Sequence, residues 1–230
     1  MTTNFTLEYV AAPDTSNSML EETVNLFSSA YGIWGPLASE KMGKFCKPGN
    51  RIKMSVQRLR EQSLASGTDS VLVRGLAGST LAGYAFATRW DFQGRQICWV
   101  TQLCILRRLA SDGKENAVFG ILSSHPAAIL GAARAWGCGI ERLDLPVIRE
   151  RAAGVIASSP VAYVRNAKFR GSLLGDEDQE GSCCADTQFW VDHRERLAAL
   201  AELKEKGVAW PYGPLPEGCE FLLLVEAGDD

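Results

Sequence analysis

The stretch ICWVTQLCIL, residues 97–106, determines how we interpret the rest of the chain. An apolar run of this length with several β-branched residues is typical of a strand that is buried on both faces. Thr101 and Gln102 interrupt the run with two polar side chains. Because buried hydroxyl and amide groups need hydrogen-bond partners, these residues either line a site or occupy satisfied positions in the core. Pattern alone leaves both interpretations open.

Strands and helices precede this stretch. A capping box of Ser18 and Glu21 predicts a helix that ends near residue 31, and Asn50 is placed to cap a second helix over residues 51–64. Glycines at a turn predict a hairpin just before the stretch. The strands that we expect here are residues 5–10, 71–74 and 81–90.

A second set of strands and helices follows the stretch. Apolar or alternating runs predict three strands, and amphipathic runs separated by proline and glycine predict four helices. The strands are residues 117–124, 186–192 and 221–225, and the helices are residues 127–136, 143–158, 161–167 and 194–206. This order of elements predicts a mixed α/β fold.

Composition limits the classes of function. The 230 residues are enough for a substantial core, and 46% hydrophobic and 22% charged residues are typical of a globular chain. A net charge of −3 argues against nucleic acid as the main partner. No apolar run approaches the ~20 residues of a membrane helix, and residues 1–10 lack the pattern of a secretory signal. We therefore expect a cytoplasmic protein without a membrane partner.

The seven cysteines do not have the spacing of a metal site. Cys98, Cys104 and Cys138 lie in apolar surroundings, which suits reduced thiols in the cytosol. Cys104 would be a nucleophile only if it were exposed. We predict no metal site.

Three short motifs carry a resemblance to a known family. They are WVTQL at residues 99–103, SSHPAA at 123–128 and DTQFWVDH at 186–193. With the closing segment 210–223, they resemble the GCN5-related N-acetyltransferase (GNAT) superfamily, and in particular a group of fungal GNAT-like proteins. The resemblance covers roughly residues 71–225 and implies a GNAT-like fold over the whole chain. Its core would span about residues 5–145 and a C-terminal extension about 146–225.

The resemblance implies a site for an acyl donor. In that superfamily the strands equivalent to residues 97–106 and 117–124 form a parallel pair that splays apart, and the pantetheine of acetyl-CoA lies in the wedge. A loop of pattern Q/R-x-x-G-x-G/A then holds the pyrophosphate at a helix N-terminus. Here Gly113 fits the first glycine, whereas Glu115 replaces the second. The residues assigned to the donor are Leu103, Ile105, Arg107, Arg108 and Gly113.

The resemblance also places catalytic candidates at the wedge, namely Thr101, Gln102, His125 and His193. His125 either acts as the base or hydrogen-bonds the start of the following helix. His193 either pairs with an acid such as Asp186 or begins a helix with Asp192 as its capping partner. Trp34, Trp99, Ser123 and Ser124 are assigned to substrate binding.

These assignments imply a GNAT-like enzyme that transfers an acyl group from acetyl-CoA or a related thioester to a small molecule. Two alternatives stay open because folds host unrelated chemistries. In one, the altered loop means that CoA is no longer used, and the wedge catalyses cyclisation, isomerisation or decarboxylation of a secondary metabolite. In the other, the chain is a non-catalytic binding protein.

Overall fold

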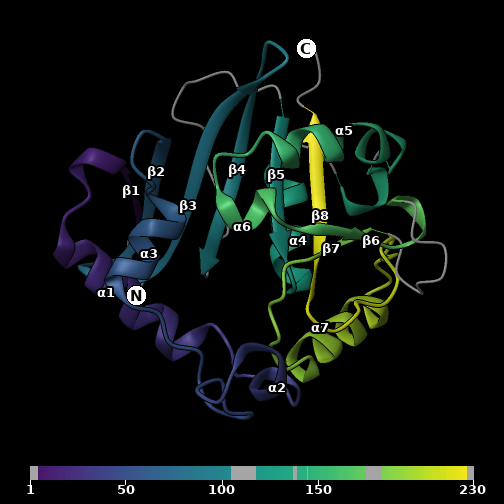
Figure 1. The fold of residues 1–230 in the computed structure, drawn as a ribbon, viewed down its shortest axis with the longest axis horizontal. Helices are drawn as coiled ribbons and strands as arrows, with labels where there is room; N and C mark the ends of the chain where they lie inside the picture. The colour runs from purple at the N-terminus through teal and green to yellow at the C-terminus, as the bar shows by residue number, and fades with distance from the viewer. Residues whose placement is uncertain (1–4, 105–117, 137–138, 144, 175–182, 227–230) are drawn as a thin grey trace.

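A single mixed sheet of eight strands organises the described part of the computed structural model, which comprises residues 5–104, 118–136, 139–143, 145–174 and 183–226. The strands lie side by side in the order β1-β2-β3-β4-β5-β8-β7-β6 (Figure 1). Their bounds are β1 Phe5–Ala11, β2 Asp69–Ala77, β3 Thr80–Phe92, β4 Arg95–Cys104, β5 Val118–Ser123, β6 Lys168–Arg170, β7 Cys184–Asp186 and β8 Cys219–Glu226. The expected mixed α/β fold is therefore confirmed.

One parallel contact joins two antiparallel regions of this sheet. β1 to β4 form an antiparallel meander, with Gly78 at φ +64° in the β2–β3 turn as the hairpin pattern predicts. β5, β8, β7 and β6 pair antiparallel on the other side. β4 and β5 are parallel, which confirms the pairing expected for the two apolar stretches.

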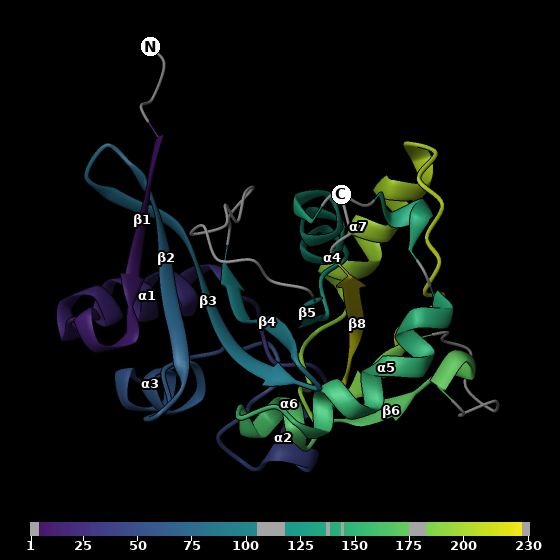
Figure 2. The same cartoon turned by 90° about the horizontal axis from the view of Figure 1, so that it is seen from above.

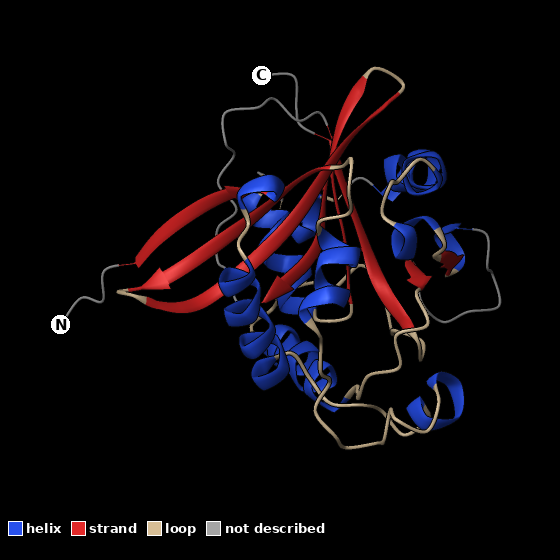
Figure 3. Cartoon of the chain, turned by 60° about the vertical axis from the view of Figure 1, so that its left-hand side comes forward, coloured by secondary structure: helices blue, strands red, loops and turns tan. Residues whose placement is uncertain are grey.

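Helices cover both faces of the sheet. In Figure 1, α3, α5 and α6 lie in front of the strands and α4 lies behind them, and Figure 2 shows α4 and α7 together on the same side. Figure 3 shows how strongly the strands twist and fan out beneath the helices. The helices are α1 Asn17–Ala30, α2 Ala38–Met42, α3 Val56–Ser63, α4 Pro126–Ala135, α5 Leu145–Ala157, α6 Ala162–Arg165 and α7 Arg194–Glu205. The 3-10 turns are η1 Ala12–Asp14, η2 Ile140–Arg142 and η3 Ser172–Leu174.

The first helices begin at other residues than predicted. Ser16, not Ser18, accepts a hydrogen bond from the Met19 backbone amide at the start of α1. α3 begins at Val56 after a Ser55 cap, and not after Asn50. Residues 51 and 52 cannot start a helix because they pair in extended form with residues 32 and 33.

The predicted strand over residues 186–192 is wrong for most of its length. β7 ends at Asp186, whose carboxylate accepts a hydrogen bond from the Gln188 backbone amide in a local turn. Gln188 has φ +59°, which takes the chain out of the extended conformation. Only Val191 pairs again, in an isolated bridge with Trp34.

The main core lies around β4, β5 and β8, and a second cluster lies between β2–β4 and the helices α1 and α3. Trp99 is fully buried and its ring lies tilted against that of Trp90, while it occupies the space beside Gly120 on β5. A Cβ at residue 120 would clash with that ring. None of the described helices is both long and apolar enough to cross a membrane.

Candidate functional site

The parallel strands β4 and β5 separate toward their carboxyl ends. Their register pairs run from Ile97–Val118 to Val100–Ile121 and stop there, although both strands continue. On the other edge of β4, the pairing with β3 skips Thr101, because Val100 lies opposite Ala87 and Gln102 opposite Phe86. Such a bulge bends a strand and increases its twist, which takes β4 away from β5 (Figure 1). The carboxyl ends of both strands therefore border the same region.

The two polar residues in the apolar stretch have partners there. The Thr101 hydroxyl donates to the Phe86 carbonyl at 3.3 Å, and the Gln102 side-chain oxygen accepts from the Tyr84 hydroxyl at 3.0 Å. Both residues are half-buried at the point of separation. Both side chains are therefore satisfied by β3, as one interpretation from the sequence expected. That they line a site stays a prediction.

Tyr163 on α6 reaches this point from the C-terminal part of the chain. Its hydroxyl donates to the Thr101 carbonyl at 2.5 Å, so α6 is hydrogen-bonded to β4 where β5 has left it. Burial raises the pKa of Tyr163, and the nearby Glu220 carboxylate adds to the shift. The phenol is therefore neutral near pH 7 and acts as a donor.

His125 begins α4 at the end of β5. Its Nδ1 accepts a hydrogen bond from the Ala127 backbone amide at 3.2 Å, and its own amide donates to Ser123 Oγ at 3.2 Å. Burial lowers the pKa of His125, which favours the neutral ring. Since Nδ1 accepts, the proton of that ring lies on Nε2, which makes Nε2 a donor toward any ligand.

Glu220 is the acid that the sequence interpretation missed. It lies at the start of β8, is 6% exposed, and is near the backbone amide of Ser124. Burial raises the pKa of Glu220, while the Thr187 hydroxyl, the Arg196 guanidinium and the Ser124 amide oppose the shift. A signal was present, because Glu220 directly precedes the apolar run FLLLV and belongs to the same strand.

Arg196 was also missed. It lies in the first turn of α7 and is 6% exposed. Burial lowers the pKa of Arg196 to about 10, so it remains cationic near neutral pH, and Glu220 and Tyr31 oppose the shift. Its spacing to Leu200 and Leu203 is the signal, because residues four and seven apart share one face of a helix and both leucines pack on the core.

His193 precedes α7 and packs beside Arg196. Its Nε2 lies 3.8 Å from a Glu217 carboxylate oxygen, while Asp186 bonds to Gln188 instead. Burial lowers the pKa of His193 to about 4, and Arg196 adds to this shift. The Asp192 carboxylate accepts hydrogen bonds from the backbone amide and the side chain of Arg194, so Asp192 caps the start of α7. His193 is thus a neutral imidazole near pH 7.

Six side chains from five elements and their flanking residues are linked by electrostatic interactions, and one of them, Tyr163, is hydrogen-bonded to β4 where β4 and β5 separate. Tyr31 is the C-cap residue of α1. Arg196 interacts electrostatically with Tyr31, His125, His193 and Glu220, and also with the carboxylates of Glu217 and Asp192. Tyr163 interacts in the same way with Glu220 and Tyr31. We call Tyr31, His125, Tyr163, His193, Arg196 and Glu220 the polar cluster. It combines a buried cation, a buried acid, two neutral imidazoles and two phenols.

The remaining predicted residues lie in the core or outside the described residues. Trp99 is fully buried before the point of separation, and Trp34 is 9% exposed within the second core cluster. Leu103 is half-buried on β4, and Ser124 is buried next to Glu220. Cys104 is buried, which raises the pKa of its thiol to about 11 and keeps it protonated near pH 7. Four predicted residues lie outside the described residues, namely Ile105, Arg107, Arg108 and Gly113.

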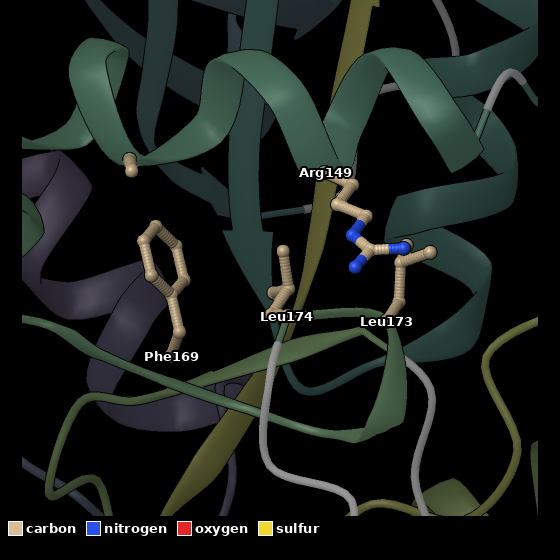
Figure 4. Close-up of a pocket in the computed structure, with 5 residues that line it drawn as sticks. Arg149, Phe169, Leu173 and Leu174 are labelled. Carbon is tan, nitrogen blue, oxygen red and sulfur yellow. The ribbon is translucent and has the colours of Figure 1, made fainter.

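A separate hollow of about 240 Å³ lies between α5 and β6. Arg149 and Ala153 line it from α5, Phe169 from β6, and Leu173 and Leu174 from η3. Figure 4 shows the Arg149 guanidinium beside the two leucines, with Phe169 on the other side of the hollow. It contains no member of the polar cluster and only one ionisable residue, so its lining offers less for catalysis.

Within the described ranges, no three His, Cys, Asp or Glu side chains are grouped as metal ligands would be. A scan of protein-family models and a search of curated proteins found no match to the chain. The sheet topology and the polar cluster are therefore the main basis for inferring its activity.

Proposed function

We propose that the chain is a GNAT-like enzyme that transfers an acyl group from acetyl-CoA or a related thioester to a small molecule. The observation that carries the proposal is the separation of β4 and β5 beyond Val100, where Tyr163 is bonded to β4 and His125 follows β5. Ligands of open α/β sheets bind outside the carboxyl ends of strands, which is where this separation occurs. The resemblance at residues 99–103 and 123–128 points to the same two strands.

The free edge of β4 suits an extended donor. Beyond Val100, that edge has no partner strand among the residues that the structure describes, so its main-chain groups could bind an amide-containing arm such as pantetheine. The Thr101 carbonyl is already bound by Tyr163. We therefore place the donor from Leu103 onward, continuing to the sequence-based candidates Ile105, Arg107, Arg108 and Gly113.

The polar cluster supplies the groups that acyl transfer needs. The nucleophile of the acceptor bonds to the thioester carbonyl carbon, the carbon–sulfur bond breaks, and the acceptor loses a proton to a base. We assign the base to Glu220, because a raised pKa makes a carboxylate a stronger proton acceptor. We assign His125 to hydrogen-bond donation, because its Nε2–H suits the charge that develops on the thioester oxygen or the departing sulfur.

A second candidate function is acid–base catalysis without CoA. The hydrogen bond from Tyr163 to the Thr101 carbonyl favours it, because the extension already occupies the main-chain group at the point of separation. In the expected pyrophosphate loop, Glu115 replaces the second glycine, which also favours chemistry without CoA. Cyclisation, isomerisation or decarboxylation would then use Glu220 as the base and His125 as the donor, without a thioester.

Calorimetric titration of acetyl-CoA into the purified chain separates these functions. We expect micromolar binding that weakens by about 10²–10⁴-fold in an Arg107→Ala/Arg108→Ala variant, since two charge-assisted bonds contribute roughly 3–6 kcal/mol. A Lys53→Ala/Arg58→Ala variant, which removes two exposed cations near or in α3, should bind as the wild type does. No heat at millimolar acetyl-CoA would reject the thioester donor and favour the second function.

Turnover tests the role of Glu220. Thiol release from acetyl-CoA in the presence of a panel of small amines should fall by about 10²–10⁴-fold in Glu220→Gln. A folded Glu220→Gln variant with wild-type turnover would show that another group is the base. If the wild type releases no thiol and converts none of the compounds tested, the non-catalytic alternative gains support.

A further inference from the structure

The polar cluster contains a buried cation for which the described residues supply no contacting anion. Arg196 is 6% exposed, and its Nη1 has no hydrogen-bond partner among the residues that the structure describes. Glu220 is close enough to interact electrostatically, but no ion pair or hydrogen bond to Arg196 is formed in that part of the chain. A buried charge without a contacting partner costs several kcal/mol, so such groups are normally paired.

Arg74 shows how this chain satisfies a buried arginine whose role is structural. It is 8% exposed on β2, and its Nη1 binds the Glu8 carboxylate at 2.6 Å. Its Nη2 binds the Glu22 carboxylate of α1. Two acids from neighbouring elements thus use both terminal nitrogens of Arg74, whereas Nη1 of Arg196 has no partner within the described part of the chain.

The surroundings of Arg196 favour an anion of low charge. Two imidazoles interact electrostatically with it, His125 from the end of β5 and His193 from the residue before α7, and both are neutral near pH 7. Tyr31 adds a neutral phenol, and the N-terminus of α7 adds a positive potential. Glu220, Glu217 and Asp192 contribute negative charges, which disfavour a dianion such as phosphate at the same place.

We propose that Arg196 holds a carboxylate of the small-molecule substrate, so that the substrate of this site is a carboxylic acid. The planar guanidinium matches a carboxylate through paired, charge-assisted hydrogen bonds. The remainder of the substrate then lies toward Glu220 and His125, the groups assigned to proton transfer and hydrogen-bond donation. The inference rests on the proposed function only in taking this cluster as the substrate site.

Propionate and its uncharged analogue propionamide probe the site directly. Titrated at pH 7.5 and followed by chemical-shift changes of the ¹⁵N-labelled chain, propionate should bind and propionamide should bind at least tenfold more weakly. Arg196→Gln should weaken propionate binding by about 10–100-fold, which corresponds to one lost charge-assisted contact. Arg194→Gln is the matched control, because Arg194 lies two residues away on α7 and is exposed, and its affinity should stay within twofold of the wild type.

A second variant keeps the test decisive if Arg196→Gln does not fold. Glu220→Gln removes the neighbouring negative charge and should strengthen propionate binding on the order of tenfold. If Arg196 served only to balance Glu220 within the fold, neither the wild type nor Glu220→Gln would distinguish propionate from propionamide.

Three results would overturn the inference. They are equal binding of propionate and propionamide, equal losses in Arg194→Gln and Arg196→Gln, and tighter binding of inorganic phosphate than of propionate. Propionate binding needs no acetyl-CoA, so the two proposals fail separately. A chain that binds propionate at Arg196 but not acetyl-CoA would keep the carboxylate site and lose the thioester donor.

Discussion

The paired and separated halves of the β4–β5 contact differ in chemistry although they belong to the same two strands. From Ile97 to Val100, β4 pairs with β5, and its neighbours are apolar side chains of the main core. From Thr101 onward the two strands part, Tyr163 of the polar cluster is hydrogen-bonded to β4, and His125 follows the end of β5. One bulged residue, Thr101, marks the boundary.

This difference shows how a small local change can make a site out of a core strand. A bulge adds one residue to one strand and bends it, so the partner strand is lost on that side. The main-chain groups released by the bend then need other partners, and Tyr163 supplies one of them. We therefore expect substitutions in the paired half to change the free energy of unfolding most. We expect residues of the separated half to make that free energy depend on pH.

The largest effect is expected from Trp99→Ala in the paired half. Removal of this fully buried indole should lower the free energy of unfolding by about 3–5 kcal/mol, because the surrounding core cannot close the cavity. Urea unfolding followed by circular dichroism measures the change. Leu197→Ala, at a leucine that is 61% exposed on α7, should change it by less than about 0.5 kcal/mol. Equal losses in the two variants would contradict the assignment of Trp99 to the core.

Gly120→Ala tests the opposite change in the same half. The added methyl group would overlap the Trp99 ring, so we expect the free energy of unfolding to fall by about 1–3 kcal/mol. Gly131→Ala on α4 is the control, because nothing lies within 4 Å of its added Cβ. That variant should be more stable by about 0.4–1 kcal/mol. A Gly120→Ala variant as stable as the wild type would mean that the Trp99 ring can move at little cost.

In the separated half, we predict that the free energy of unfolding depends on pH through His193. The pKa of His193 is lowered to about 4 from an ordinary 6.5, so between these values the unfolded chain binds more protons than the folded chain. The stability that this residue contributes is therefore complete above pH 6.5 and is lost as the pH falls toward 4. By pH 5 the loss should reach about 2 kcal/mol.

Urea unfolding at pH 7.5 and pH 5 measures this loss, and His193→Gln should remove most of it. His125 has a lowered pKa of the same sign, so a smaller part of the dependence should persist in that variant. Identical pH dependence in the wild type and His193→Gln would show that the imidazole is not buried as a neutral group.

The smallest effect is expected from Tyr163→Phe. The variant loses the hydrogen bond to the Thr101 carbonyl, and the free energy of unfolding should fall by about 0.5–1.5 kcal/mol. Tyr9→Phe, at an exposed tyrosine of β1, should have no measurable effect.

Acetyl-CoA titration of Tyr163→Phe also tests the two functions. Tighter binding would favour a donor that competes with Tyr163, and unchanged absence of binding would favour chemistry without CoA.

The sequence predicted the strands but not their distortions. The apolar stretches at residues 97–106 and 117–124 were sufficient to predict two buried strands, and the resemblance to the GNAT superfamily implied that they pair in parallel, as they do. The bulge at Thr101 could not be read from the pattern, since it depends on how β3 pairs with β4. The start of α3 depends likewise on the pairing of Arg51 with Ile33, which is distant in sequence.

The polar cluster was predicted only in part, for a similar reason. His125 and His193 were found because histidine is rare in the chain, with two in 230 residues. Glu220 and Arg196 look like ordinary acidic and basic residues next to apolar runs, and only the tertiary structure shows that both are buried together. Tyr31 and Tyr163 lie 132 positions apart in the chain, and only the tertiary structure brings Tyr31 at the end of α1 and Tyr163 on α6 close enough to interact electrostatically.

The contact between Trp99 and Gly120 has a consequence for how sequences of this kind diverge. The indole fills the space that a side chain on β5 would need, so the two positions share one fixed volume. A larger residue at position 120 becomes acceptable only after residue 99 has become smaller. Conversely, a tryptophan at position 99 becomes acceptable only after position 120 has become glycine. In any set of related sequences, these two positions should therefore covary in size, while neighbouring positions such as Thr101 change independently of them.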